Sequence, residues 1–365
     1  MVQDVTSWIQ AISQLLFIVF LIALFLGLNQ RIQLYIWTRD IRGKLTVLEG
    51  LAEDAKKRTL DFLVKNGARS PETTLTRITE FFVIQPVSIE PVDIIRRLDV
   101  LVSLRNRRFR EEFLRAMPES SEVVRSKAEV LSEITAALAF IFKAVRHYLL
   151  LGEKTRNWVL IMQLQLLMPE LLKLADTYRK ALNDFLAGYP IGDSAGPLVA
   201  AKLANYSAEW KDIEWETVSA EVNIEGRRVI LVKAKGPMPT VGKPGSAVEK
   251  LVKEMGERPS LLLTVDAALK LEGEESGSVA EGVGAAIGDI GPEKIRFERI
   301  AAEFGIPLRA LVIKMSLEEA ISAMNKQIYD GVEKAVQRAR EIIISETKPG
   351  DTVILAGIGN TSGVL

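Results

Sequence analysis

The residues best suited to chemistry follow a predicted strand in the last third of the chain. Asp266 comes directly after the apolar run 260–265. Ligands of an open α/β sheet gather beyond the carboxyl ends of its strands, which is where Asp266 would stand. Asp266, Glu272 and Glu274 offer carboxylates of the kind that Mg²⁺ takes beside substrate phosphates, and Lys270 lies among them. A ligand site with Mg²⁺ is one hypothesis. A solvated turn is the other, because no spacing here is diagnostic of a metal.

Glycine-bearing turns precede several predicted helices in the same region. Helix starts of this kind leave backbone N–H groups free and positively polarised, so a phosphate can bind there. None of the turns has Walker or Rossmann spacing, and ordinary capping explains any single one, whereas three in one domain favour a ligand. A further turn follows the last strand and is either a phosphate loop or an exposed terminus. The candidate ligand-binding residues in these turns are Gly192, Asp193, Gly196, Gly242, Lys243, Gly245, Gly288, Asp289, Gly291, Gly359 and Asn360, and Glu293 and Lys294 follow closely behind Asp289.

Several catalytic classes lack the residues that they need. The one histidine, His147, lies in the helical half, so histidine acid–base chemistry has no supplier in the α/β region. The absence of cysteine excludes disulfides, thiolate nucleophiles and zinc–thiolate sites. Ser246, Ser276 and Ser278 lack a nucleophile elbow, which argues against a serine hydrolase. The sequence therefore leaves open whether the protein is an enzyme.

The charge balance gives no support for nucleic acid as a partner. Forty-seven basic residues face forty-seven acidic ones, so no global field would steer a polyanion. The strongest local excess is an arginine-rich run over 96–115, which Asp99, Glu111 and Glu112 interrupt. This pattern favours a solvated helix face over a surface for anionic headgroups or RNA.

The elements that would position the candidate residues form an α/β domain over 189–365, with a mixed, largely parallel sheet. Residues 217–224 and 227–235 each have the alternating pattern of a β-strand, and the short turn Glu225-Gly226 between them predicts an antiparallel hairpin. Strands that alternate with helices favour parallel pairing for the remainder. We expect those strands at 260–265, 283–287, 308–314 and 352–356, and helices at 244–255, 292–304 and 317–346.

The region 31–188 has helical periodicity and predicts five or six cytosolic helices. Ser70-Pro71-Glu72 and Glu90-Pro91 are typical helix starts. The helix over 157–188 is the most apolar, but charged residues inside it would be costly in a bilayer. We therefore expect a core helix or the interface of a homo-oligomer there, and an amphipathic helix over 134–151.

A membrane anchor is predicted at the beginning of the chain. Residues 8–28 carry no charge and would reach about 30 Å as a helix, the thickness of the hydrocarbon core. Arg31, Arg39, Arg42 and Lys44 follow, whereas the tail 1–7 has no basic residue. The positive-inside bias then places the tail outside the cell membrane and everything after the single-pass anchor at 8–30 in the cytosol. A cleaved signal peptide would have a basic start and a shorter apolar core.

The combined layout resembles a known family. The N-terminal span, the acidic run 266–277, Gly288-Asp289-Ile290-Gly291-Pro292 and the closing Gly357-Ile358-Gly359-Asn360-Thr361 are similar to archaeal single-pass membrane-anchored proteins of unknown function. The resemblance covers nearly the whole chain and implies an archaeal source. It brings no assigned reaction and no catalytic residue.

Two functions follow from these observations. In the first, the tethered α/β domain binds a phosphorylated small molecule or nucleotide, with Mg²⁺ as a candidate cofactor. In the second, the protein is a non-catalytic oligomeric membrane scaffold, which the apolar helix and the missing catalytic signatures favour.

Overall fold

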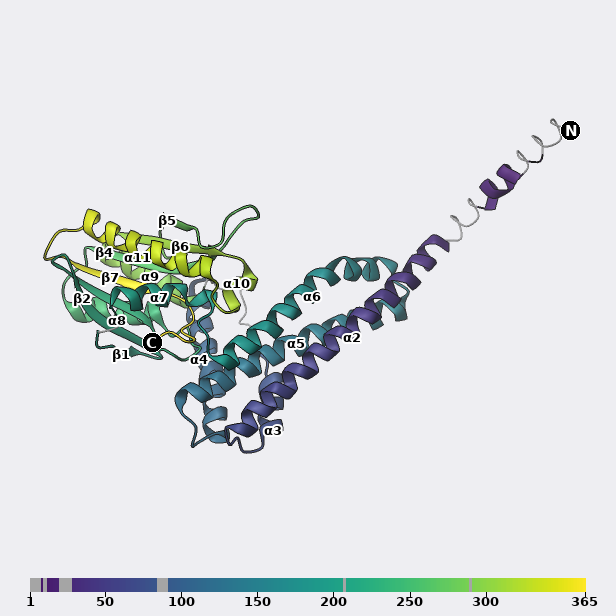
Figure 1. Ribbon diagram of the computed structural model, residues 1–365, viewed down its shortest axis with the longest axis horizontal. Helices are drawn as coiled ribbons and strands as arrows, with labels where there is room; N and C mark the ends of the chain where they lie inside the picture. Colours follow the sequence, from purple (N-terminus) through teal and green to yellow (C-terminus); the bar gives the residue numbers. More distant parts are fainter. Residues whose placement is uncertain (1–7, 9–11, 20–27, 84–90, 206–207, 289–290) are drawn as a thin grey trace. The chain divides into compact units, whose positions relative to one another are not determined.

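The computed structural model describes residue 8 and residues 12–19, 28–83, 91–205, 208–288 and 291–365 (Figure 1). The chain folds into two compact units. The first comprises 1–54 with 137–176, and the second comprises 55–136 with 177–365. The second unit contains all the predicted ligand-binding residues.

Five helices make up the described part of the region 28–187. Pro71 and Pro91 begin two of them, as predicted, because proline has the φ of a first helical residue and no N–H to leave unpaired. Helix α6, Trp158–Ala187, contains Pro169 in its interior. The bounds are α2 Leu28–Lys65, α3 Pro71–Thr79, α4 Pro91–Ala116, α5 Glu122–Thr155 and α6 Trp158–Ala187.

Two stretches of the predicted anchor, 9–11 and 20–27, lie outside the described residues, as does the tail 1–7. Residues 12–19 are helical, and each large apolar side chain among them is more than half exposed. Among the described residues, α5 and α6 are long and apolar enough to cross a membrane. That test uses length and composition alone, and the core helix of a soluble protein also passes it.

A seven-stranded mixed sheet forms the centre of the α/β region, in the order β1-β2-β3-β7-β4-β6-β5. The four strands β3, β7, β4 and β6 are parallel, and β1, β2 and β5 pair antiparallel at the two edges. This confirms a mixed sheet that is largely parallel in the middle. The strands are β1 Lys211–Glu214, β2 Thr217–Ile224, β3 Arg227–Ala234, β4 Leu261–Leu269, β5 Val279–Val283, β6 Leu308–Met315 and β7 Thr352–Gly357.

Helices cover both faces of the sheet (Figure 1). On one face α7, Ala195–Leu203, and α11, Lys326–Glu346, pack on residues such as Leu231, Leu263 and Leu355. On the other face α8, Pro244–Met255, and α9, Pro292–Phe304, pack on Val232 and Leu262. The central strands are apolar on both faces because both are buried, which is the pattern of a parallel sheet.

The hairpin of β2 and β3, helices α8 and α9, and strands β6 and β7 form where the sequence predicts them. The hairpin turn has positive φ at Glu225 and Gly226, which matches the twist of the two strands. The 3₁₀ turn η1, Gly192–Ser194, directly precedes α7. The short strand β1 was not predicted.

Three boundaries were predicted wrongly. Strand β4 continues to Leu269, so Asp266 lies within the strand and not in a loop behind it. The run 283–287 is not a strand beyond Val283, because the N–H of Ala286 donates to the Thr264 hydroxyl of β4 instead of to a neighbouring strand.

The predicted helix over 317–346 is broken into α10, Leu317–Ile321, and α11. Ala323 bridges to Ile191, and the Asn325 side chain accepts the N–H of Ile328 at 2.9 Å as a new helix cap.

Candidate ligand-binding site at the carboxyl edge of the sheet

The chain leaves the carboxyl ends of β4 and β7 in opposite directions. After β4 it turns toward β6, where the N–H of Lys270 donates to the Met315 carbonyl at 2.9 Å. After β7 it turns toward β3, and the Thr361 hydroxyl donates to the Lys235 carbonyl at 3.1 Å. Such a divergence between neighbouring strands is the topological switch point at which open α/β sheets bind ligands.

Asp266 lies at this divergence. Pairing between β4 and β7 ends at Val265 with Gly357, one residue before Asp266. Its side chain is buried, and its two oxygens accept backbone N–H groups from Ala267 at 2.7 Å and from Gly288 at 3.0 Å. Because β7 has no described residue paired beyond Val265, Asp266 lies at the carboxyl edge of the sheet, although β4 itself continues.

A second carboxylate, Asp193, comes from the η1 turn. Its Oδ2 accepts the backbone N–H of Asn360 at 2.8 Å, so it joins the turn before α7 to the turn after β7. Glycines make this approach feasible. A Cβ at Gly359 would lie 2.0 Å from the Asp193 carbonyl oxygen, and one at Gly196 would lie 2.2 Å from the Ile358 carbonyl oxygen. Both glycines therefore serve close backbone packing around the carboxylate.

A cavity of about 480 Å³ opens beside the two carboxylates, and we call it the carboxyl-edge cavity. Lys294, from the first turn of α9, also lines it and has no ion pair with any described residue. Its other walls are small or apolar. The lining residues are Asp193, Asp266, Ala267, Ala268, Leu269, Ala285, Ala286, Ile287, Gly288, Lys294, Val312, Met315 and Ala320.

Both carboxyl groups are biased toward the protonated form. Burial raises the pKa of Asp266 well above its usual range, and the nearby charge of Asp193 adds to this, against the two backbone N–H donors. Burial likewise raises the pKa of Asp193, against the N–H of Asn360. Two neighbouring buried acids, one of which raises the pKa of the other, are typical of functional sites.

Two family profiles of unknown function match consecutive parts of the chain. The profile described as "Protein of unknown function (DUF1512) N-terminal domain" matches residues 15–188, and "Domain of unknown function (DUF1512) C-terminal" matches residues 191–365. The chain belongs to the DUF1512 family. No curated protein matches it. The uncharacterised family implied by the resemblance is thus confirmed, whereas the archaeal source and the single-pass anchor stay predictions.

The structure brings together only part of the predicted set in this DUF1512 chain. Asp193, Asp266 and Gly288 meet at the carboxyl-edge cavity, and Gly192, Gly196, Gly359 and Asn360 pack behind Asp193. In the part of the chain that is described, Lys270 does not line the cavity. Gly291 caps α9, and Asp289 lies outside the described residues.

The turn before α8 lies at a different place and already holds an anion. The N–H of Ser246, behind Gly242 and Gly245, donates to the Glu293 carboxylate at 3.0 Å. The ammonium of Lys243 donates to the Ser103 hydroxyl at 2.8 Å. Burial raises the pKa of Glu293, against its N–H donors. A carboxylate of the chain itself thus occupies the position expected for a phosphate.

The three predicted metal ligands are not gathered. Asp266 is buried at the sheet edge, Glu272 is exposed, and Glu274 forms an ion pair with Lys314. Within the described ranges, no group of three or more His, Cys, Asp or Glu residues is placed to hold a metal ion. Because β4 runs on to Leu269, it carries the two glutamates away from Asp266.

Sequence reasoning missed the pairing of Asp193 with Asp266 and the buried lysine of β3. Lys233 is 1% exposed, its ammonium lies 4.6 Å from the centre of the Trp210 ring, and burial lowers its pKa to about 8. A lysine inside the apolar run of β3 was the visible signal for this residue.

Proposed function

We propose that this protein is a membrane-anchored cytosolic protein whose α/β domain binds a phosphorylated small molecule, with a nucleotide as the best-fitting class. One observation carries the proposal. The switch point between β4 and β7 holds a cavity with two carboxyl groups at one wall and an ammonium without an ion pair among the described residues at another.

The chemistry of the walls favours this class of ligand. Carboxyl oxygens of Asp193 and Asp266 would accept hydrogen bonds from hydroxyl groups such as those of ribose. Lys294, in the first turn of α9, would take the phosphate, since an ammonium at a helix start favours an anion. The apolar walls from Ala285 to Ile287 would bury the remainder of the ligand.

Protonation at the carboxyl pair reduces its repulsion of a phosphate. With raised pKa values, the pair holds a proton more readily than two exposed aspartates would. A Mg²⁺ ion would have the same effect. In that alternative arrangement the Asp193 and Asp266 carboxylates would hold the ion and the ligand's phosphates in place of the ribose hydroxyls, since this hard cation needs only one or two protein carboxylates.

The test is ligand-induced stabilisation of the full chain in detergent. A panel of nucleotides and sugar phosphates, with and without Mg²⁺, is screened for an increase in Tm. A ligand at 100 times its Kd stabilises the folded state by about 2.7 kcal/mol, which corresponds to a Tm increase of about 3–5 °C for a chain of this size.

Two cavity variants, Asp266→Asn and Lys294→Gln, should lose the increase. The matched control is Glu272→Gln, which removes an exposed carboxylate outside the cavity. Loss in the control with retention in the cavity variants would contradict the site. No increase with any member of the panel would contradict ligand binding.

The membrane part of the proposal is supported by the exposed apolar residues at 12–19 and the basic residues that follow them. Alkaline carbonate should leave the full chain in the membrane pellet. Because the natural chain has no cysteine, Ser7→Cys and Ser70→Cys give single labelling sites. A membrane-impermeant maleimide should label only Ser7→Cys in intact cells, and the reverse result would contradict the orientation.

An oligomeric scaffold is the second candidate. It is supported by large apolar side chains that stay exposed on α5 and α6, such as Phe140 at 72% and Leu166 at 70%. Light scattering of the detergent-solubilised chain should then give a multimer that Phe140→Gln with Leu166→Gln dissociates. A monomeric parent chain would contradict this candidate.

A further inference from the structure

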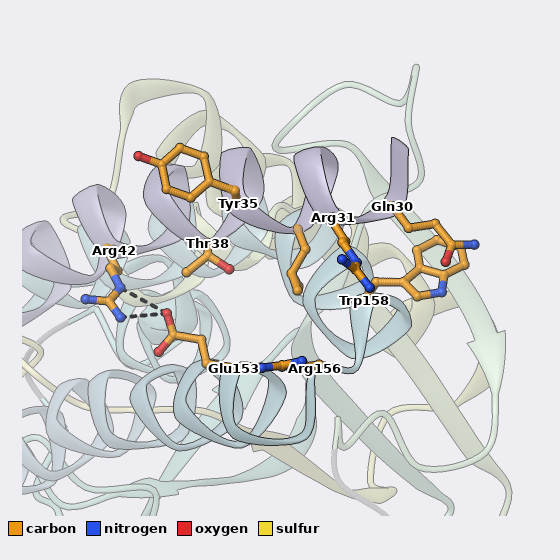
Figure 2. Close-up of a pocket in the computed structure, with 9 residues that line it drawn as sticks. Gln30, Arg31, Tyr35, Thr38, Arg42, Glu153, Arg156 and Trp158 are labelled. Atoms are coloured by element: carbon orange, nitrogen blue, oxygen red, sulfur yellow. Dashed lines mark hydrogen bonds and ion pairs between the residues drawn. The ribbon is translucent and has the colours of Figure 1, made fainter. Parts of the chain in front are cut away.

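The first compact unit contains a second concave site, at the beginning of α2. A cleft of about 860 Å³ lies between the first turns of α2 and the turn that joins α5 to α6 (Figure 2). We call it the basic cleft. Its lining residues are Gln30, Arg31, Leu34, Tyr35, Thr38 and Arg42 of α2, with Glu153, Arg156 and Trp158 from the other side.

The charges in the basic cleft do not balance. Arg42 is held by the one carboxylate, with its Nε 3.0 Å and its Nη2 2.7 Å from Glu153 Oε1. Arg31 and Arg156 have no ion pair with any residue that the structure describes. Two guanidinium groups are therefore available to an anion, and guanidinium binds phosphate oxygens through paired N–H donors.

The ring systems at the cleft are of the kind that favours a lipid interface. Tyr35 and Trp158 both line it, and each combines an apolar ring with a polar group (Figure 2). Such residues concentrate at the headgroup level of membranes. Along α2, Arg31 lies about one turn after Leu28, a rise of about 5 Å. Tyr35 lies about two turns after Leu28, a rise of about 10 Å.

We propose that the basic cleft binds the phosphate headgroup of an anionic phospholipid. This inference rests on the proposed membrane anchor at 8–30, whose end would bring the first turns of α2 to the headgroup layer. Arg31 and Arg156 contact the phosphate, and the rings of Tyr35 and Trp158 lie against the glycerol and upper acyl region. A free phosphate would use the arginines but gain nothing from the rings.

The test measures binding to the full chain in a nonionic detergent by calorimetry. The probes are monomeric dihexanoyl phosphatidylglycerol, dihexanoyl phosphatidylcholine and inorganic phosphate. The parent chain should bind the anionic lipid about tenfold more tightly than the other two probes. The double variant Arg31→Gln with Arg156→Gln should weaken that binding by about tenfold or more, since each lost contact is a charge-assisted hydrogen bond.

The matched control is Arg107→Gln with Arg108→Gln, which removes the same charge from exposed positions of α4. It should keep the affinity of the parent. Equal affinity in parent and cleft variant would overturn the inference, and so would inorganic phosphate that binds as tightly as the lipid. Carbonate extraction of the same preparations separates the two proposals. A chain that is extracted but binds the lipid contradicts the anchor alone, and one that is retained but shows no such preference contradicts the cleft alone.

Discussion

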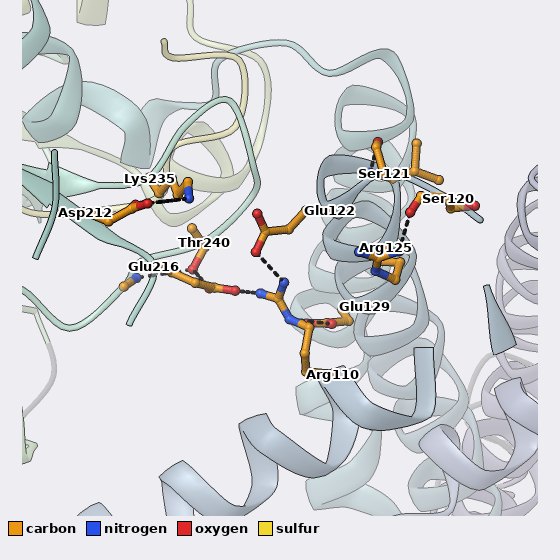
Figure 3. A network of polar contacts seen from close by, with 12 residues as sticks. Arg110, Ser120, Ser121, Glu122, Arg125, Glu129, Asp212, Glu216, Lys235 and Thr240 are labelled. Carbon is orange, nitrogen blue, oxygen red and sulfur yellow. Dashed lines mark hydrogen bonds and ion pairs between the residues drawn. The ribbon is translucent and has the colours of Figure 1, made fainter. Parts of the chain in front are cut away.

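Two groups of carboxyl side chains in the second compact unit have contrasting partners. At the carboxyl-edge cavity, Asp193 and Asp266 accept only backbone N–H groups from described residues, and they repel each other. Elsewhere, carboxylates surround one guanidinium, that of Arg110 (Figure 3). We call the second group, Arg110, Glu122, Glu129 and Glu216, the Arg110 cluster.

In the Arg110 cluster, one guanidinium forms ion pairs with three carboxylates. The Nε of Arg110 lies 3.3 Å from Glu129 Oε1, its Nη1 lies 3.2 Å from Glu122 Oε1, and its Nη2 pairs with Glu216. The guanidinium also lies 5.7 Å from the centre of the Trp215 ring. Glu216 accepts the Thr240 hydroxyl as well, so α4, α5 and the start of β2 are joined through one cation.

The comparison shows which buried charges hold the fold and which are available to a ligand. Ion pairs between opposite charges, as around Arg110, hold neighbouring elements of the fold together. Asp193 and Asp266 instead have no cation paired with them among the described residues, and they line a cavity together with Lys294, a combination typical of binding sites. The following variants test that distinction.

The largest effect is expected for Arg110→Gln. Without the guanidinium, Glu216 is left as a largely buried carboxylate without its cation, and breaking a buried ion pair on one side costs about 3–5 kcal/mol. Urea unfolding of the full chain in detergent should show this loss in the free energy of unfolding at pH 7. Arg108→Gln, on the exposed face of the same helix, should change it by less than about 0.5 kcal/mol. Equal losses in the two variants would refute the central role of Arg110.

Glu129→Gln should alter the pH dependence of stability. Burial raises the pKa of Glu129 to about 7, against the attraction of Arg110. The folded state thus holds the proton more tightly than the unfolded state, so stability is greatest below the ordinary carboxyl pKa and is lost as the pH rises to about 7. The loss is about 3 kcal/mol, at 1.36 kcal/mol for each pKa unit.

Glutamine cannot ionise, so the variant should lack this dependence. Urea midpoints from pH 4.5 to pH 8 should fall in the parent chain and fall less steeply in Glu129→Gln. Parallel curves would mean that Glu129 is ionised throughout and that the cluster does not shift its titration.

Local patterns predicted much of the fold. The hairpin of β2 and β3 follows from strand alternation and a two-residue turn, and α9 begins at Pro292 and ends at Phe304 as its proline and glycine signals predict. The break between α10 and α11 was not predictable in this way. It depends on the bridge from Ala323 to Ile191, more than a hundred residues away.

The candidate site was predictable only in part. Asp266 was found because a carboxylate at a strand end is a local signal, but its partner was assumed to be a sequence neighbour such as Glu272 or Glu274. The actual neighbour, Asp193, reaches it because β7 inserts between β3 and β4. Strand order is set by the packing of the whole domain, so a pair that depends on it leaves no local trace.

The smallest effect on stability is expected for Asp266→Asn at pH 7. Asparagine removes a buried group whose ionised form is unfavourable, but it keeps only one acceptor oxygen for the two N–H groups of Ala267 and Gly288. These contributions oppose each other, so the free energy of unfolding should change by less than about 1 kcal/mol.

The pH profile separates the two contributions. The pKa of Asp266 is raised in the folded state, so the parent chain loses stability as the pH rises above the ordinary range of an aspartate, and Asp266→Asn should lose less. Relative to the parent, the variant therefore gains stability between pH 4 and pH 8, while it loses ligand-induced stabilisation. A loss in the free energy of unfolding as large as that of Arg110→Gln would show that Asp266 holds the fold, and the contrast between the two regions would disappear.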